Sequence, residues 1–162
     1  MRLGITGHRP NKLNNEYNGG PLTNKISNEL CKAVMCAFPS QPILVTGMAQ
    51  GVDQIFAELA IDMNFRFVAV IPCLEQEKLW PEIAQKRYHR ILSSPLCHVH
   101  QVYNGPYYNG CMQRRNRYIV DNCDKLIAVW DGSLGGTQNC IEYARYVGRE
   151  IIHINPRELM KY

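Results

Sequence analysis

Three turns of the sequence combine glycine with side chains that could bind an anion. They span Thr6–Pro10 (TGHRP), Thr46–Asp53 (TGMAQGVD) and Asp131–Thr137 (DGSLGGT), each directly after an apolar run. Glycine lets the backbone turn sharply and approach a ligand closely. The second and third turns run into segments of helical periodicity, and the free N–H groups at a helix N-terminus favour phosphate. Together the three turns predict an anion site.

Three side chains within these turns, and a tryptophan after another strand, could contact a nucleotide-like ligand. His8 and Arg9 extend the first turn, and the planar guanidinium of Arg9 can hold a phosphate through two hydrogen bonds. Asp53 lies where a helix begins, so it either only stabilises the helix dipole or also accepts ribose hydroxyls. Trp80 follows a strand and its loop, where an indole either stacks on a base or covers the core.

A basic stretch, Arg114-Arg115-Asn116-Arg117, opens another predicted helix. With about 3.6 residues per turn, these side chains cannot all point one way. Asn116 falls on the apolar stripe of the helix, so we expect it to be buried and hydrogen-bonded. We expect Arg115 at the boundary of the stripe, and Arg114 and Arg117 in solvent.

Alternating strands and helices must position these turns. Apolar runs predict strands at 2–6, 43–46, 66–71, 125–130 and 150–154, with a weaker one at 97–102, and helical periodicity fills the gaps. Continuously apolar strands are typical of a sheet covered on both faces. The pattern predicts a single-domain Rossmann-like α/β protein over residues 1–162, with a doubly wound, mainly parallel sheet and helices on both faces. Ligands of such sheets lie beyond the carboxyl ends of the strands. The predicted ligand-binding residues are Gly7, His8, Arg9, Gly47, Gly51, Asp53, Trp80, Arg115, Asn116, Asp131, Gly135, Gly136 and Thr137.

Composition narrows the class of protein. The chain has 162 residues, of which 46% are hydrophobic and 20% charged, which excludes intrinsic disorder and coiled coil. No apolar run approaches the roughly 18 residues that a membrane span needs, so we expect no membrane partner. The patterns G-x-x-x-x-G-K-[ST] and G-x-G-x-x-G are both missing from the sequence, which argues against a P-loop and against ordinary dinucleotide redox binding.

The cysteines indicate a reducing compartment. There are seven, an odd number, and none forms a C-x-x-C pair, which predicts free thiols in a cytoplasmic protein. The spacing of Cys and His predicts no metal site, and we expect no cofactor. His98 and His100 share one face of a predicted strand, which leaves a metal role there as an alternative to a partly exposed strand.

The formal charge of +4 is unevenly distributed along the chain. No acidic residue lies between Glu82 and Asp121, a stretch that contains six basic residues including Arg115. One basic segment in an otherwise slightly acidic chain fits a small anionic ligand better than a long nucleic-acid track.

The motifs TGHRP, TGMAQGVDQIFAELA, MQRRNRYIVDNCDKLIAVWDG and GGTQNCIEYA, in this order, resemble the SLOG superfamily, and within it the YpsA-like proteins. The likeness covers nearly the whole chain. It implies a Rossmann-like fold and a nucleotide or nucleotide-derived ligand. Other members of the superfamily are the phosphoribohydrolases once described as lysine decarboxylases, the DNA-processing protein DprA, and sensors of NAD-derived signals.

The resemblance to the phosphoribohydrolases places Arg115 on their catalytic arginine, but the position of their glutamate holds Cys140. The nearest acid is Glu142, and two further helical positions turn its side chain by about 200°. Cleavage of an N-glycosidic bond calls for a positioned carboxylate. Asp53 or Asp131 could supply a substitute carboxylate.

Three functions follow from these observations. The first is binding of a nucleoside monophosphate, ADP-ribose or cyclic ADP-ribose type of signal, as a sensor, sponge or regulator. The second is a nucleotide N-glycosidase that releases a free base, with Arg115 and Asp53 catalytic. The third is a nucleic-acid interaction module, indicated by the likeness to DprA and by three tyrosines near the basic stretch. We also expect a homo-oligomer, because relatives self-associate and symmetric dimers are the commonest form.

Overall fold

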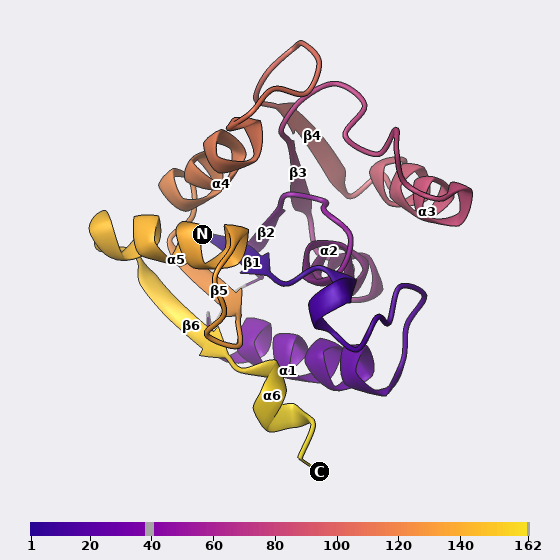
Figure 1. Cartoon of the computed structure of the whole chain (residues 1–162). Coiled ribbons are helices and arrows are strands. Elements are labelled where there is room, and N and C mark those ends of the chain that lie inside the picture. Colours follow the sequence, from indigo (N-terminus) through magenta and orange to yellow (C-terminus); the bar gives the residue numbers. More distant parts are fainter. Residues whose placement is uncertain (38–40, 162) are drawn as a thin grey trace.

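Six parallel strands form one sheet in the computed structural model, which describes residues 1–37 and 41–161 (Figure 1). The strand order is β4-β3-β2-β1-β5-β6, and each pair of neighbours runs in parallel. The strands are β1 (Arg2–Gly7), β2 (Ile43–Thr46), β3 (Phe67–Ile71), β4 (Cys97–Gln101), β5 (Lys125–Val129) and β6 (Glu150–Ile154).

Helices cover both faces of the sheet. They are α1 (Pro21–Ala37), α2 (Val52–Asp62), α3 (Glu82–Leu92), α4 (Cys111–Asp121), α5 (Gly136–Tyr146) and the short α6 (Pro156–Leu159), with a 3-10 turn η1 at Pro10–Lys12. In Figure 1, α1, α2 and α3 lie to one side of the strands and α4 and α5 to the other. This confirms the doubly wound, Rossmann-like prediction, and the predicted strand bounds agree to within a residue.

Alternate side chains of the strands enter two separate cores. Leu3 and Ile5 of β1 pack with Phe56 in the core beneath α1, α2 and α3. Leu126 of β5 packs with Val120 in the smaller core beneath α4 and α5. Because the central strands are covered on both sides, every residue of β3 is buried, which is why its sequence is continuously apolar. The edge strand β4 is largely exposed, which explains its weaker sequence signal.

The sheet reverses its winding between β1 and β5. The chain moves outward from β1 to β4 with helices on one face, and from β5 to β6 with a helix on the other. Gly7 pairs with Val129, so the turns that follow these two strands start side by side. Ligands of open α/β sheets bind in the crevice at such a switch point. Among residues 1–37 and 41–161, no helix combines the length and hydropathy needed to span a bilayer.

Candidate ligand-binding site

A cavity of about 280 Å³ opens at this switch point. We call it the glycine-loop cavity, because the turns after β1 and β5 form much of its wall. It is lined by Thr6, Gly7, His8, Arg9, Asn11, Lys12, Ala49, Asp53, Met112, Arg115, Asn116, Ser133, Gly135, Gly136 and Thr137. Nine of the thirteen predicted ligand-binding residues are among them, contributed by segments far apart in the sequence.

Arg115 is the buried anchor of this cavity. Its side chain is 4% exposed, Nη1 donates to the Gly47 carbonyl oxygen at 2.6 Å, and Nε donates to Asn116 Oδ1 at 2.8 Å. A Cβ on Gly47 would lie 2.3 Å from Nη1, so only glycine leaves room for the guanidinium. The prediction for the helix was wrong here: Arg115 is buried and Asn116 half-buried. A polar cavity covers the first turn of α4, so the apolar stripe does not decide burial there.

Asp53 is the carboxylate that faces Arg115 in the wall. It is buried, and its Oδ2 accepts a hydrogen bond from the Ala49 N–H at 3.2 Å. Burial raises the pKa of Asp53, and the nearby charges of Arg115 and Arg9 oppose that rise. Burial likewise lowers the pKa of Arg115, opposed by Asp53. Three cations and one carboxylate line the cavity, so its net charge favours an anion.

His8 and Asp131 join the two turns at the switch point. His8 Nε2 lies 2.8 Å from Asp131 Oδ1, and the Ser133 N–H donates to the same oxygen at 2.9 Å. Burial lowers the pKa of His8 despite the attraction of Asp131. Burial alone would raise the pKa of Asp131, but hydrogen bonds from Ser133 and the proximity of His8 hold it below its usual value. Asp131 does not line the cavity itself but contacts His8, which does, and its predicted ligand-binding role stays a prediction.

Gly47, Gly51 and Trp80 also lie outside the lining of the glycine-loop cavity, and their ligand-binding roles stay predictions. Gly51 has φ = 94°, and a Cβ there would lie 2.5 Å from the His8 carbonyl oxygen. Gly47 and Gly51 therefore shape the wall by letting Arg115 and His8 approach. Trp80 instead borders an adjoining hollow of about 710 Å³, which we call the Trp80 cavity. It is lined by Arg9, Leu74, Glu75, Gln76, Lys78, Leu79, Trp80, Pro106, Tyr107 and Met112.

Lys12 is the main lining residue that sequence reasoning missed. Its Nζ donates to Ser133 Oγ at 2.9 Å and to the Leu134 carbonyl oxygen at 2.8 Å. These bonds fix the turn after β5 against the turn after β1, beside the start of α5. Lys12 follows TGHRP by two residues, so the continuation of that motif was the available signal.

The basic segment does not form a single positive surface. Lys86 pairs with Glu82, and both Arg87 and Arg90 pair with Glu58 on α2. These pairs offset much of the positive charge of α3, and of the segment only Arg115, on α4, brings a charge to the cavity.

Cys140 and Glu142, compared with the phosphoribohydrolase glutamate, and the histidines weighed for metal binding do not line the cavity. Cys140 is a buried residue of α5, and Glu142 on the same helix is exposed and accepts a hydrogen bond from Gln138. His100 stacks on Tyr118 with ring centroids 4.3 Å apart, and His98 is exposed. Within the described ranges no three His, Cys, Asp or Glu side chains are grouped to hold a metal ion.

A family model described as DNA recombination-mediator protein A matches residues 18–161. The chain belongs to the DNA recombination-mediator protein A family. It is 28% identical over 129 residues to an uncharacterized SPbeta prophage-derived protein, YoqJ, of Bacillus subtilis, covering 69% of this chain and 75% of that protein. The family assignment and the fold together place the chain in the SLOG superfamily, as predicted.

Two solved structures share the fold of this family member. DNA processing protein A from Helicobacter pylori, described with a single-stranded DNA binding mode, superposes with a TM-score of 0.66 at 16% identity, covering 99% of this chain and 72% of that one. The protein of the same name from Streptococcus pneumoniae gives 0.68 at 16% identity, covering 94% of this chain. This chain spans about half the length of the pneumococcal protein, 49%.

Proposed function

We propose that this family member binds a nucleotide or nucleotide-derived molecule, with a phosphate group in the glycine-loop cavity. The observation that carries the proposal is Arg115, a buried cation that shares the cavity with Arg9 and Lys12. Arg115 Nη2 has only a weak contact, 3.8 Å to Met112 Sδ, so it can donate to a phosphate oxygen. The N-terminus of α5, at Gly136, adds free N–H groups and the positive end of the helix dipole.

The role of such binding would be that of a sensor, sponge or regulator. A hydrolase is the alternative reading of the same cavity, and it would depend on Asp53, the carboxylate among the lining residues. Burial raises the pKa of Asp53 and so favours its neutral, proton-donating form. Chromatography of the incubated nucleotides for free base separates the two, since binding alone leaves the N-glycosidic bond intact.

Calorimetric titration with nucleoside monophosphates, ADP-ribose, cyclic ADP-ribose isomers and NAD tests the proposal. We expect Arg9→Ala and Lys12→Ala each to weaken binding about tenfold, because each removes a charge-assisted contact. Arg114→Ala is the matched control, since Arg114 is exposed on α4 and does not line the cavity. The proposal would be refuted if no ligand of the panel gave a heat of binding above the heat of dilution. It would also be refuted if Arg9→Ala and Lys12→Ala both bound ligand as tightly as the wild type.

Single-stranded DNA is the second candidate ligand, and family membership favours it. The Helicobacter pylori protein, which shares the fold, is described as binding single-stranded DNA. In this chain, exposed Tyr103 and Tyr107 lie on the loop before α4, close in sequence to exposed Arg114. Proteins that bind single-stranded nucleic acid combine positively charged side chains with aromatic side chains on which bases stack. An oligonucleotide should then bind with an affinity that falls steeply with salt, whereas one phosphate gives a shallow dependence.

A further inference from the structure

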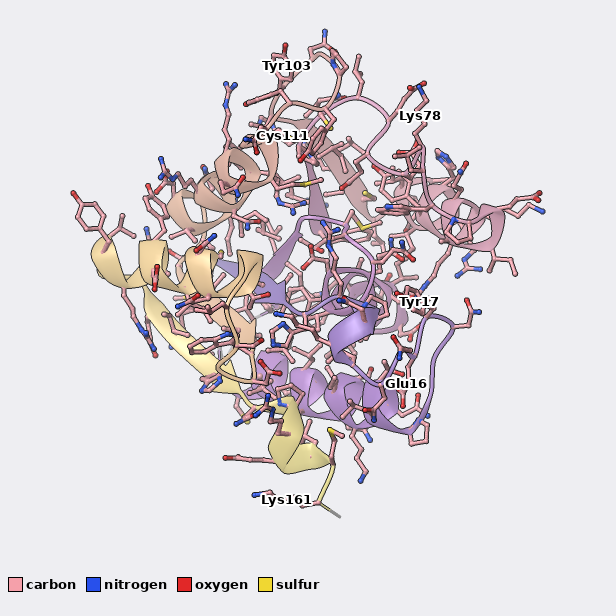
Figure 2. All side chains as sticks on the ribbon, in the orientation of Figure 1. Glu16, Tyr17, Lys78, Tyr103, Cys111 and Lys161 are labelled. Carbon is pink, nitrogen blue, oxygen red and sulfur yellow. The ribbon has the colours of Figure 1, made fainter. Side chains whose placement is uncertain are left out.

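The Trp80 cavity shares part of its wall with the glycine-loop cavity. Arg9 and Met112 line both, so a molecule held in one can extend past these side chains into the other. The two loops that form the Trp80 cavity are joined by a hydrogen bond from the Leu74 N–H to the Gly105 carbonyl oxygen, 2.8 Å long. Figure 2 shows Lys78 and Tyr103, one from each loop, at the same end of the molecule as Cys111.

The chemistry of the two cavities is complementary. The glycine-loop cavity is charged, and at about 280 Å³ it falls just short of the roughly 300–1,000 Å³ usual for whole ligands. The Trp80 cavity has about 710 Å³. Its wall is largely aromatic and aliphatic: Leu74, Leu79, Trp80, Pro106, Tyr107 and Met112. Leu79 is 93% exposed and Tyr107 64%, an amount of open apolar surface that a bound ring would cover.

The Trp80 ring is fixed in position by its contact with Tyr88. The two rings meet edge-on, with centroids 5.4 Å apart and planes at 86°, and the Trp80 carbonyl oxygen accepts from Gln85 Nε2 at 2.9 Å. An aromatic side chain held in this way loses little conformational entropy when a planar ring stacks on it.

Gln76 supplies an independent sign of a missing partner. Its Oε1 is buried and has no hydrogen-bond partner within the described part of the chain. An unsatisfied buried acceptor costs about 1–3 kcal/mol. Its Nε2 contacts the Gly47 carbonyl oxygen at 3.4 Å, the same oxygen that accepts from Arg115. Gln76 therefore links the wall of the Trp80 cavity, which it lines, to the carbonyl oxygen that Arg115 binds, and it carries an acceptor without a partner within the described part of the chain.

We infer that the Trp80 cavity holds the base of the nucleotide whose phosphate lies in the glycine-loop cavity. This inference rests on the proposed function and adds to it the ligand class: a nucleotide with an intact aromatic base, stacked between Trp80 and Tyr107, with an N–H directed at Gln76. A sugar phosphate without a base would occupy only the glycine-loop cavity and leave the Trp80 cavity empty.

Calorimetry with the four ribonucleoside 5′-monophosphates and with ribose 5-phosphate tests the inference. We expect at least one nucleotide to bind the full chain about tenfold or more tightly than ribose 5-phosphate, a gain in line with base stacking. Trp80→Ala and Tyr107→Ala should each remove most of that gain and leave ribose 5-phosphate binding unchanged. Tyr146→Ala, an 86% exposed tyrosine on α5, is the control.

Tyr107→Ala keeps the test valid if Trp80→Ala does not fold, because Tyr107 lies on an exposed loop. Nucleotides that bind no more tightly than ribose 5-phosphate, or a preference that both substitutions leave intact, would overturn the inference while the phosphate site stands. If neither nucleotides nor ribose 5-phosphate bind, the proposed function itself fails.

Discussion

Burying Arg115 costs free energy, and its neighbours show how that cost is offset. The guanidinium donates to the Gly47 carbonyl oxygen and to Asn116, and it shares a buried setting with Asp53. Buried charges persist only when they are paired and hydrogen-bonded. The sequence indicated the right helix and the right arginine, but not its burial. The carbonyl that receives Arg115 lies 68 positions away, and no local pattern reports such a partner.

Replacing His8 should reduce the sensitivity of the protein to acid. The pKa of His8 is lowered from 6.5 by burial, so protonation disfavours the folded state. The stability this provides is present above pH 6.5 and is lost as the pH falls through the folded pKa. We expect the melting temperature to fall between pH 7.5 and pH 5, and to fall less in His8→Gln.

His98→Gln serves as the control, since His98 is exposed on β4. Asp131 does not contribute to the change between pH 7.5 and pH 5. Its pKa is lowered, so the stability that it provides is lost only below pH 3.8. Equal pH dependence in wild type and His8→Gln would contradict the prediction.

At the scale of elements, the strands were predictable because burial on both faces makes them continuously apolar. Which face of α4 is buried could not be predicted from the sequence. Its buried residues are Cys111, Arg115, Ile119 and Val120, whereas the apolar stripe of the sequence included Asn116 and left Arg115 at its boundary. Only the second half of α4 meets an apolar core. Hydrophobic periodicity therefore predicts the half of the helix that touches the core and misses the half that borders a cavity.

Glu16 should stabilise the start of α1. Its carboxylate accepts from the N–H groups of Leu22 at 3.0 Å and Thr23 at 2.7 Å, which would otherwise lack partners. Glu16→Ala should lower the free energy of unfolding by about 1 kcal/mol, as the loss of a helix cap does. Urea denaturation measures this. Glu29→Ala on the same helix breaks only an exposed pair with Lys32 and should change stability by less than about 0.5 kcal/mol. Equal losses in both variants would argue against the cap.

At the scale of the whole molecule, alternating strands and helices were enough to predict the architecture. The Trp80 cavity was not predictable, because it forms where the loops after β3 and β4 meet, and contacts between loops leave no periodic signal. The single-domain span, the cytoplasmic location and the homo-oligomer all stay predictions.

The thiols should divide sharply by reactivity. All seven cysteines are free; Cys36 is exposed, while Cys73, Cys111, Cys123 and Cys140 are buried. Burial raises the pKa of Cys73, Cys123 and Cys140 to about 11, so little thiolate forms near neutral pH. Titration of the native protein with a thiol reagent should show one cysteine that reacts fast, and Cys36→Ser should remove it. In denaturant all seven cysteines should react. Rapid labelling of the buried four in the native protein would contradict the packing described.

The central position of β1 has a consequence for how the protein comes into being. β1 leaves the ribosome before the other five strands of this sheet, yet it lies between β2 and β5, and the cavity beside it is lined by residues from Thr6 to Thr137. A nascent chain can pair β1 with β2 early, but its other edge stays open until β5 has been synthesised. Domains generally fold as units during synthesis. Ligand can therefore bind only after the start of α5 has been synthesised, and its binding would report that both halves of the sheet have joined.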